Sequence, residues 1–150
     1  MPPRLSRCAP TLLAVLLALP ILNVLPAAAH TITVVIPATL DAAGRVGCAL
    51  FSGERGFPMD NAAARMQWLP AQPEGVRCVF RDVADGTYAV SVVLDMNGNQ
   101  RVDTNFVGLP TEAWGVSNNV RPTLRAPRFD EAAFRLSGGQ PIELTIQVLR

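Results

Sequence analysis

The chain has 150 residues, of which 13 are basic and 12 acidic, and its formal net charge at pH 7 is +1. All of the basic residues are Arg, and their near balance with Asp and Glu leaves no basic patch of the kind that nucleic-acid binding needs. Because the chain has no Lys and a single His, His30, Schiff-base chemistry and a three-His zinc site are excluded, and Ser-His-Asp or Cys-His sites lack an interior base.

Residues 1–29 have the pattern of a secretory signal peptide. Two arginines precede an apolar run (residues 12–25), and Ala27 and Ala29 fit the A-x-A pattern of a cleavage site. We therefore expect a domain of residues 30–150, exported to the periplasm or outside the cell, with no stable membrane anchor after cleavage. A retained anchor is the alternative, but the apolar run is short for a membrane span and contains a Pro.

Cys48 and Cys78 are the two cysteines outside the predicted signal peptide. Each lies on the apolar face of a predicted strand, over residues 46–50 and 76–80. In an exported chain this pair predicts a disulfide. Two separate buried thiols are the alternative.

Alternating apolar residues predict short strands along the exported part of the chain. They cover residues 32–36, 46–51, 76–80, 88–94, 134–136 and 142–148. Helical periodicity is poor, and its best candidate is residues 60–68, where Asp60 is placed to cap a short Ala-rich turn. The expected fold is an all-β, antiparallel β-sandwich of the immunoglobulin or transthyretin type, with a small barrel as the alternative.

Oxygen-bearing side chains alternate after the strand predicted over 88–94. Asp95, Asn97, Asn99 and Asp103 have the spacing of the first, third, fifth and ninth positions of a calcium loop, with Arg101 at the position that supplies a backbone oxygen. The central Gly and the final Glu of that loop are missing. The segment therefore predicts a weak calcium site, and the alternative is a turn held by Asx hydrogen bonds.

A second polar stretch follows and predicts a binding surface for a protein or glycan partner. It contains Asn105, Trp114, Ser117, Asn118 and Asn119. Aromatic residues are enriched at binding hot spots, and loops at the end of a sandwich commonly carry function. The alternative is that Trp114 plugs the end of the sandwich while the Asn side chains satisfy turns.

Several motifs in fixed order carry a family resemblance. They occupy residues 86–90, 95–99, 103–106, 108–110, 114–119 and 129–136. The chain resembles a bacterial secreted family known as domain of unknown function 2141. The resemblance implies a compact, β-rich exported domain, but no established activity, substrate or cofactor.

This sequence departs from that family's pattern near the predicted calcium loop. Leu94 stands where the family often has His, and Gln100 where Gly is common. Ala113, Trp114 and Val116 stand where Gly, Tyr and Phe are usual. Without that His, any function of the loop depends on oxygen donors and backbone.

We expect a non-catalytic binding or structural module of the cell envelope, with a calcium-stabilised loop. The alternative is a hydrolase, acting for example on glycans, that uses Asp95, Asp103 and Glu112. A purely structural component without an ion is a third option. After cleavage, the α-amine and imidazole of His30 have the donors to chelate Cu(II), but a second interior His is lacking and a frayed terminal residue is the ordinary explanation.

Overall fold

The computed structural model describes residues 29–38, 43–108 and 110–150. The predicted signal peptide, apart from Ala29, lies outside these residues. The described elements are, in chain order, β1 (Ala29–Ile36), β2 (Arg45–Phe51), η1 (Asn61–Ala63), β3 (Arg65–Pro70), β4 (Val76–Ala84), β5 (Gly86–Asp95), β6 (Ala113–Val116), η2 (Ser117–Asn119), α1 (Phe129–Ala132), β7 (Phe134–Leu136) and β8 (Ile142–Thr145).

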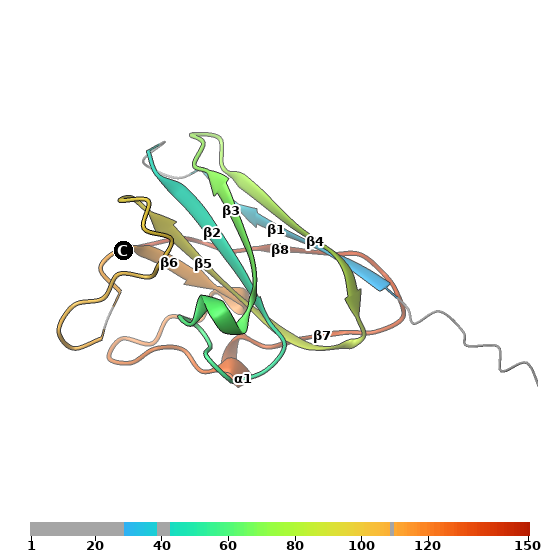
Figure 1. Ribbon diagram of the computed structural model, residues 1–150. Helices are drawn as coiled ribbons and strands as arrows, with labels where there is room; N and C mark the ends of the chain where they lie inside the picture. Colours follow the sequence, from blue (N-terminus) through green and yellow to red (C-terminus); the bar gives the residue numbers. More distant parts are fainter. Residues whose placement is uncertain (1–28, 39–42, 109) are drawn as a thin grey trace, which may run out of the picture.

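The strands form two sheets packed against each other (Figure 1). One sheet has the order β4-β1-β8, and the other has the order β3-β2-β5-β6, with β7 paired to β5. The predicted all-β sandwich is therefore confirmed, and the described strands do not close into a single barrel.

One strand pair departs from the predicted antiparallel arrangement. β8 runs parallel to β1, with Val35 opposite Thr145. The strand predicted over residues 142–148 ends at Thr145, and Leu149 then pairs with Trp114 of β6 in the other sheet. Alternation shows which side chains face the core but not the direction of the neighbouring strand, so the sequence pattern did not reveal this pairing.

Alternate residues of the central strands build the core between the sheets. Those from β1, β2, β4 and β5 are Ile32, Val34, Ile36, Val46, Cys48, Leu50, Val76, Cys78, Phe80, Val90, Val92 and Leu94. All of them are buried, as the alternation of the sequence predicts.

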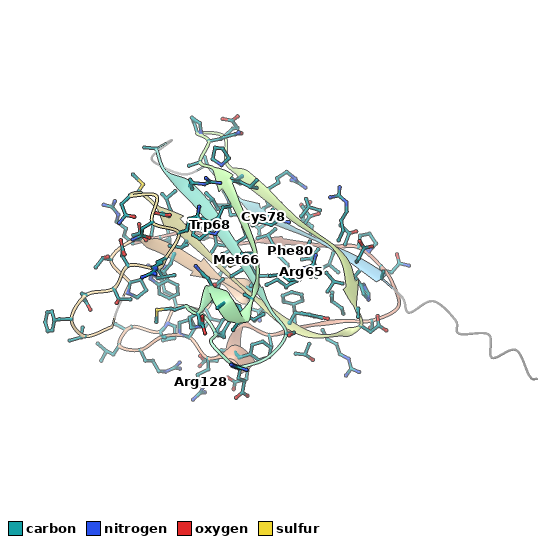
Figure 2. The ribbon with its side chains drawn as sticks, in the orientation of Figure 1. Arg65, Met66, Trp68, Cys78, Phe80 and Arg128 are labelled. Atoms are coloured by element: carbon teal, nitrogen blue, oxygen red, sulfur yellow. A yellow bond between two sulfur atoms is a disulfide. The ribbon has the colours of Figure 1, made fainter. Side chains whose placement is uncertain are left out.

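The predicted disulfide between Cys48 and Cys78 is present in this core. The two Cα atoms lie 6.5 Å apart, and both side chains are fully buried. Cys48 belongs to β2 and Cys78, labelled in Figure 2, belongs to β4. The bond therefore connects one sheet to the other.

A second, smaller core covers the outer face of the larger sheet. Ala89 of β5 and Val116 of β6 pack there against Ala132 of α1. Phe57 closes this core, with its ring 5.3 Å from that of Phe51 and 5.8 Å from that of Phe129, edge to face in both cases. As a result, β2 and β5 are buried on both faces.

Of residues 60–68, the best helical candidate of the sequence, only the first turn is helical. Asp60 does cap a turn, since its Oδ1 accepts the N–H of Ala62 at 3.0 Å, but that turn is the 3-10 element η1. The chain then extends into β3, where Trp68, labelled in Figure 2, packs its ring on Gly47 of β2. Pairing with β2 thus overrides the weak helical preference of the Ala residues.

Candidate functional site

Asp95 begins the predicted calcium loop at the end of β5, and its side chain is fully buried. Its Oδ1 accepts the backbone N–H of Gly98 at 2.7 Å, and its Oδ2 accepts that of Gln100 at 2.8 Å. Gln100, which stands where a calcium loop normally has Gly, has a φ of 59°, in the left-handed region. Asp95 therefore folds the loop back over its own carboxylate.

Asn97, Asn99 and Asp103 form a separate cluster in this loop. The Nδ2 groups of Asn97 and Asn99 donate to the two carboxylate oxygens of Asp103 at 2.6 and 2.8 Å. Their Oδ1 atoms accept the backbone N–H groups of Asn99 and Arg101 at 3.0 and 2.8 Å, which is the geometry of Asx-turns. Arg101 thus contributes a backbone N–H to these turns.

Glu112 joins the two ends of the loop, a role that the sequence did not indicate. Its buried carboxylate accepts the N–H of Met96 at 3.0 Å and that of Asp103 at 3.4 Å. Thr111 adds a backbone bond to the Asp103 carbonyl at 2.8 Å. The only signal in the sequence was a carboxylate directly before β6, because its partners lie too far along the chain to be inferred from spacing.

Among the described residues, no three side chains of the His, Cys, Asp or Glu types converge closely enough to hold a metal ion. The predicted set, however, also uses Asn and backbone oxygens. The carboxylate oxygens that accept N–H groups retain further lone pairs. Calcium binding by Asp95, Asn97, Asn99, Arg101 and Asp103 stays a prediction.

The polar residues after Trp114 hold the chain together rather than projecting from it. Ser117 is fully buried, and its hydroxyl donates to the Ala132 carbonyl and accepts the Val90 N–H. Its assignment to a binding surface is therefore wrong. The exposed Asn118 and Asn119 bond backbone atoms of distant segments, so they link parts of the fold rather than satisfy local turns.

Trp114 lies at a groove of about 350 Å³ on the outer face of β5 and β6. Pro58 and Met59 line it from the segment after β2, and Val102 and Pro110 from the loop between β5 and β6. Asn105 of that loop does not line the groove, and its Oδ1 accepts the N–H of Val107 at 3.1 Å. The predicted surface residues therefore do not form one site, but Trp114 belongs to a groove.

Arg121 lies at the same groove and is held by Trp114. Its guanidinium carbon is 4.6 Å from the centroid of the Trp114 ring, a cation–π contact. Its Nη1 donates to the Trp114 carbonyl at 3.0 Å, and its Nη2 donates to the Leu149 carbonyl at 2.8 Å. The position of the charge is thus fixed by three contacts.

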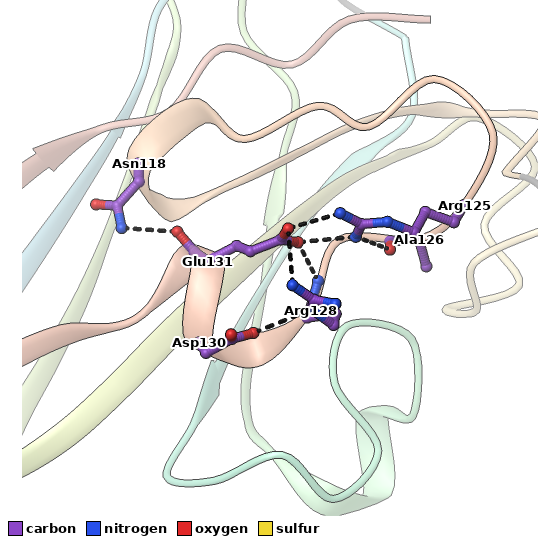
Figure 3. Close-up of polar contacts among 6 residues, drawn as sticks. All are labelled: Asn118, Arg125, Ala126, Arg128, Asp130 and Glu131. Carbon is purple, nitrogen blue, oxygen red and sulfur yellow. Dashed lines mark hydrogen bonds and ion pairs between the residues drawn. The ribbon is translucent and has the colours of Figure 1, made fainter.

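Arg125 also lines the groove, but its charge is neutralised (Figure 3). It forms a two-bond ion pair with Glu131 of α1, at 2.8 and 2.6 Å. This pair, together with the backbone N–H of Arg128 at 2.9 Å, lowers the pKa of Glu131 to about 2. Glu131 therefore stays ionised and keeps Arg125 paired.

His30 is buried in β1, which corrects the expectation of a frayed terminal residue and places this His inside the domain. Its Nδ1 lies 2.7 Å from the Gln140 carbonyl and its Nε2 lies 2.5 Å from Oδ1 of Asp85. Only a protonated ring can donate from both nitrogens. The bond to Gln140, followed by that to Asp85, raises the pKa of His30 above its ordinary value of 6.5.

Stability should consequently fall as the pH rises through the raised pKa of His30. A group whose pKa is higher in the folded state contributes fully below its unfolded value, here 6.5, and loses that contribution above its folded value. We expect the difference in thermal midpoint between the native protein and a His30→Gln variant to be larger at about pH 5.5 than at about pH 8.5. A difference that does not change with pH would contradict the protonated ring.

Comparison with known proteins identifies the family. A family model for uncharacterized proteins conserved in bacteria, DUF2141, matches residues 34–143. The chain belongs to this family. The resemblance in the ordered motifs is therefore confirmed, and the match runs from β1 into β8.

The DUF2141 family carries no assigned activity from which the site could be interpreted. No curated protein and no solved structure matches the chain. In the part of the chain that the structure describes, no helix is long and apolar enough to cross a membrane. The loop and the groove are therefore the features that bear on function.

Proposed function

We propose that this DUF2141 protein is an exported, non-catalytic binding module in which calcium orders the loop of residues 95–112 as one wall of the groove. The observation that carries the proposal is that Val102 and Pro110 of this loop line the groove beside Trp114. The disulfide between the sheets and the N-terminal signal pattern support export.

The loop has the chemistry for a hard cation. Calcium takes about six to eight oxygen ligands, which carboxylates, Asn side chains and backbone carbonyls all supply. Asp103 already attracts the Nδ2 groups of Asn97 and Asn99. Turning these two amides so that their oxygens face the ion would exchange their two bonds to Asp103 and their two Asx-turn bonds for cation contacts, with Asp95 contributing its remaining lone pairs.

The loop residues that line the groove lie close in sequence to the proposed ion ligands, so an ordered loop would also order this wall of the groove. Val102 directly precedes Asp103. Pro110, which lies two residues before Glu112, pairs with Thr104. Glu112 in turn binds the backbone at both Met96 and Asp103. An ion at Asp103 would therefore stiffen the wall that these residues form.

The alternative, a carboxylate-dependent hydrolase, has less support from the site. Among the described residues that line the groove there is no Asp or Glu. Asp95 and Glu112 are buried and accept backbone N–H groups. A general acid or base needs to reach the substrate, so we favour binding over catalysis.

Calcium should raise the thermal midpoint of the protein, because a ligand that binds only the folded state stabilises it. With an affinity of about 0.1 to 1 mM, the weak class of calcium site, the shift should grow across a series up to roughly 5 mM. The measurement is thermal unfolding in EDTA and then in calcium, with the disulfide intact.

Two controls give this test its specificity. Magnesium at the same concentrations should shift the midpoint less, since it requires a smaller and more regular oxygen shell. The Asp103→Asn variant should lose the calcium-dependent shift. A midpoint that calcium leaves unchanged would refute the ion and reduce the loop to Asx-turns.

A further inference from the structure

The groove combines apolar walls with charge of a single sign. Its described lining is mostly Pro, Val, Met and Trp, and its only charged residues are Arg121 and Arg125. The Ser91 hydroxyl in its floor already donates to the Pro58 carbonyl at 2.8 Å. A glycan, which needs several polar partners, would find few of them here.

The two arginines differ in what neutralises them. Arg125 is bound by both oxygens of Glu131. Arg121, in contrast, donates to two neutral carbonyls, and within the described parts of the chain no carboxylate lies at ion-pair distance from it. A guanidinium has more N–H donors than these two carbonyls use. Arg121 is therefore an oriented positive charge beside an apolar surface.

We propose that the groove binds a small anion with an apolar body, of the medium-chain carboxylate type, with its head group at Arg121 and its chain along Trp114 and the proline-lined walls. The volume of about 350 Å³ falls in the range of about 300 to 1,000 Å³ that small-molecule sites occupy. Charge complementarity selects the head group of the ligand, and burial of its alkyl chain supplies affinity. The proposal rests on the groove as the binding surface but does not require calcium.

Octanoate is the probe, with octanol and octylammonium as ligands of the same chain length. We expect octanoate to bind about ten-fold more tightly than octanol, since a charge-assisted hydrogen bond contributes at least about this factor. Octylammonium should bind more weakly than both. Isothermal titration calorimetry below the micelle concentration measures all three, in EDTA and in calcium.

Arg121→Gln should reduce the affinity for octanoate to that for octanol and leave octanol binding nearly unchanged. Arg81→Gln is the matched control, because it removes an exposed Arg of β4, which belongs to the other sheet and does not line the groove. Since Arg121 also holds two carbonyls, the thermal midpoint of each variant is measured. Ala126→Phe keeps Arg121 but fills part of the groove, and should weaken octanoate and octanol alike.

Equal binding of octanoate and octanol would overturn the proposal, as would selectivity for octanoate that survives Arg121→Gln. Binding of an apolar peptide through its C-terminal carboxylate, without binding of octanoate, would overturn it in favour of a protein partner. A calcium shift without octanoate binding would refute this ligand and leave the proposed function intact. Octanoate binding without a calcium shift would support this ligand and refute the calcium-ordered loop of the proposed function.

Discussion

Replacing Cys48 and Cys78 together by Ala should lower the free energy of unfolding by roughly 3 to 4 kcal/mol. The bond closes a loop with a sequence separation of 30, and opening it gives the unfolded chain more freedom to lose on folding. Because the bond joins β2 to β4, the loss should affect the packing of one sheet on the other. Chemical denaturation of the oxidised native protein and of the double variant measures it.

The native protein with its disulfide reduced is the control for this variant. Reduction opens the cross-link but leaves both sulfur atoms in the core, so it should cause most of the same loss. A further loss in the double variant would measure the space left by the two sulfurs. A total loss below about 1 kcal/mol would mean that the cross-link contributes little beyond the apolar core.

Asp95→Ala should lower the free energy of unfolding by about 2 to 4 kcal/mol, even in EDTA. The substitution removes the acceptor of the Gly98 and Gln100 N–H groups, and each hydrogen bond to a charged group contributes up to about 1.5 to 3 kcal/mol, less where water can replace the acceptor, as it can in part at these two residues. Asp95→Asn should cost less, because it retains one acceptor oxygen. Denaturant unfolding of both variants in EDTA tests the role of Asp95 independently of any ion.

Asp103→Asn is the matched comparison for Asp95→Ala. Asp103 is only partly buried, and its partners are side-chain amides of exposed residues that water can also satisfy. In EDTA its replacement should therefore cost less than about 1 kcal/mol. Equal losses in the two variants would contradict the view that Asp95 shapes the loop while Asp103 faces the ion.

Much of the fold could be predicted because its information is local. Alternation in β1, β2, β4 and β5 identified the core faces, and the pairing of the two cysteines followed from their positions on those faces. β3 was not among the predicted strands, because it follows Ala residues and its side chains are nearly all half-buried, without clear alternation. β6 has only four residues and contains a Gly, so it gave no periodic signal.

At the candidate site, too, only contacts between residues close in sequence could be predicted. The turns around Asp95 and Asn97 were anticipated because their partners lie two to five residues away. The roles of Ser117 and His30 were not, because Ala132 and Gln140 reach them through the tertiary fold. The groove could not be inferred either, since its lining comes from separate loops that only the folded chain brings together.

The contact between Leu149 and the groove also affects how the protein can be immobilised. The Leu149 carbonyl accepts the Trp114 N–H at 2.9 Å and an Arg121 N–H at 2.8 Å. Figure 1 marks the C-terminal end beside β6, whereas β1 begins at the opposite end of the molecule. An affinity tag or surface tether added after Arg150 would start beside the groove and crowd its entrance. Attachment ahead of β1 would leave that entrance open to a ligand.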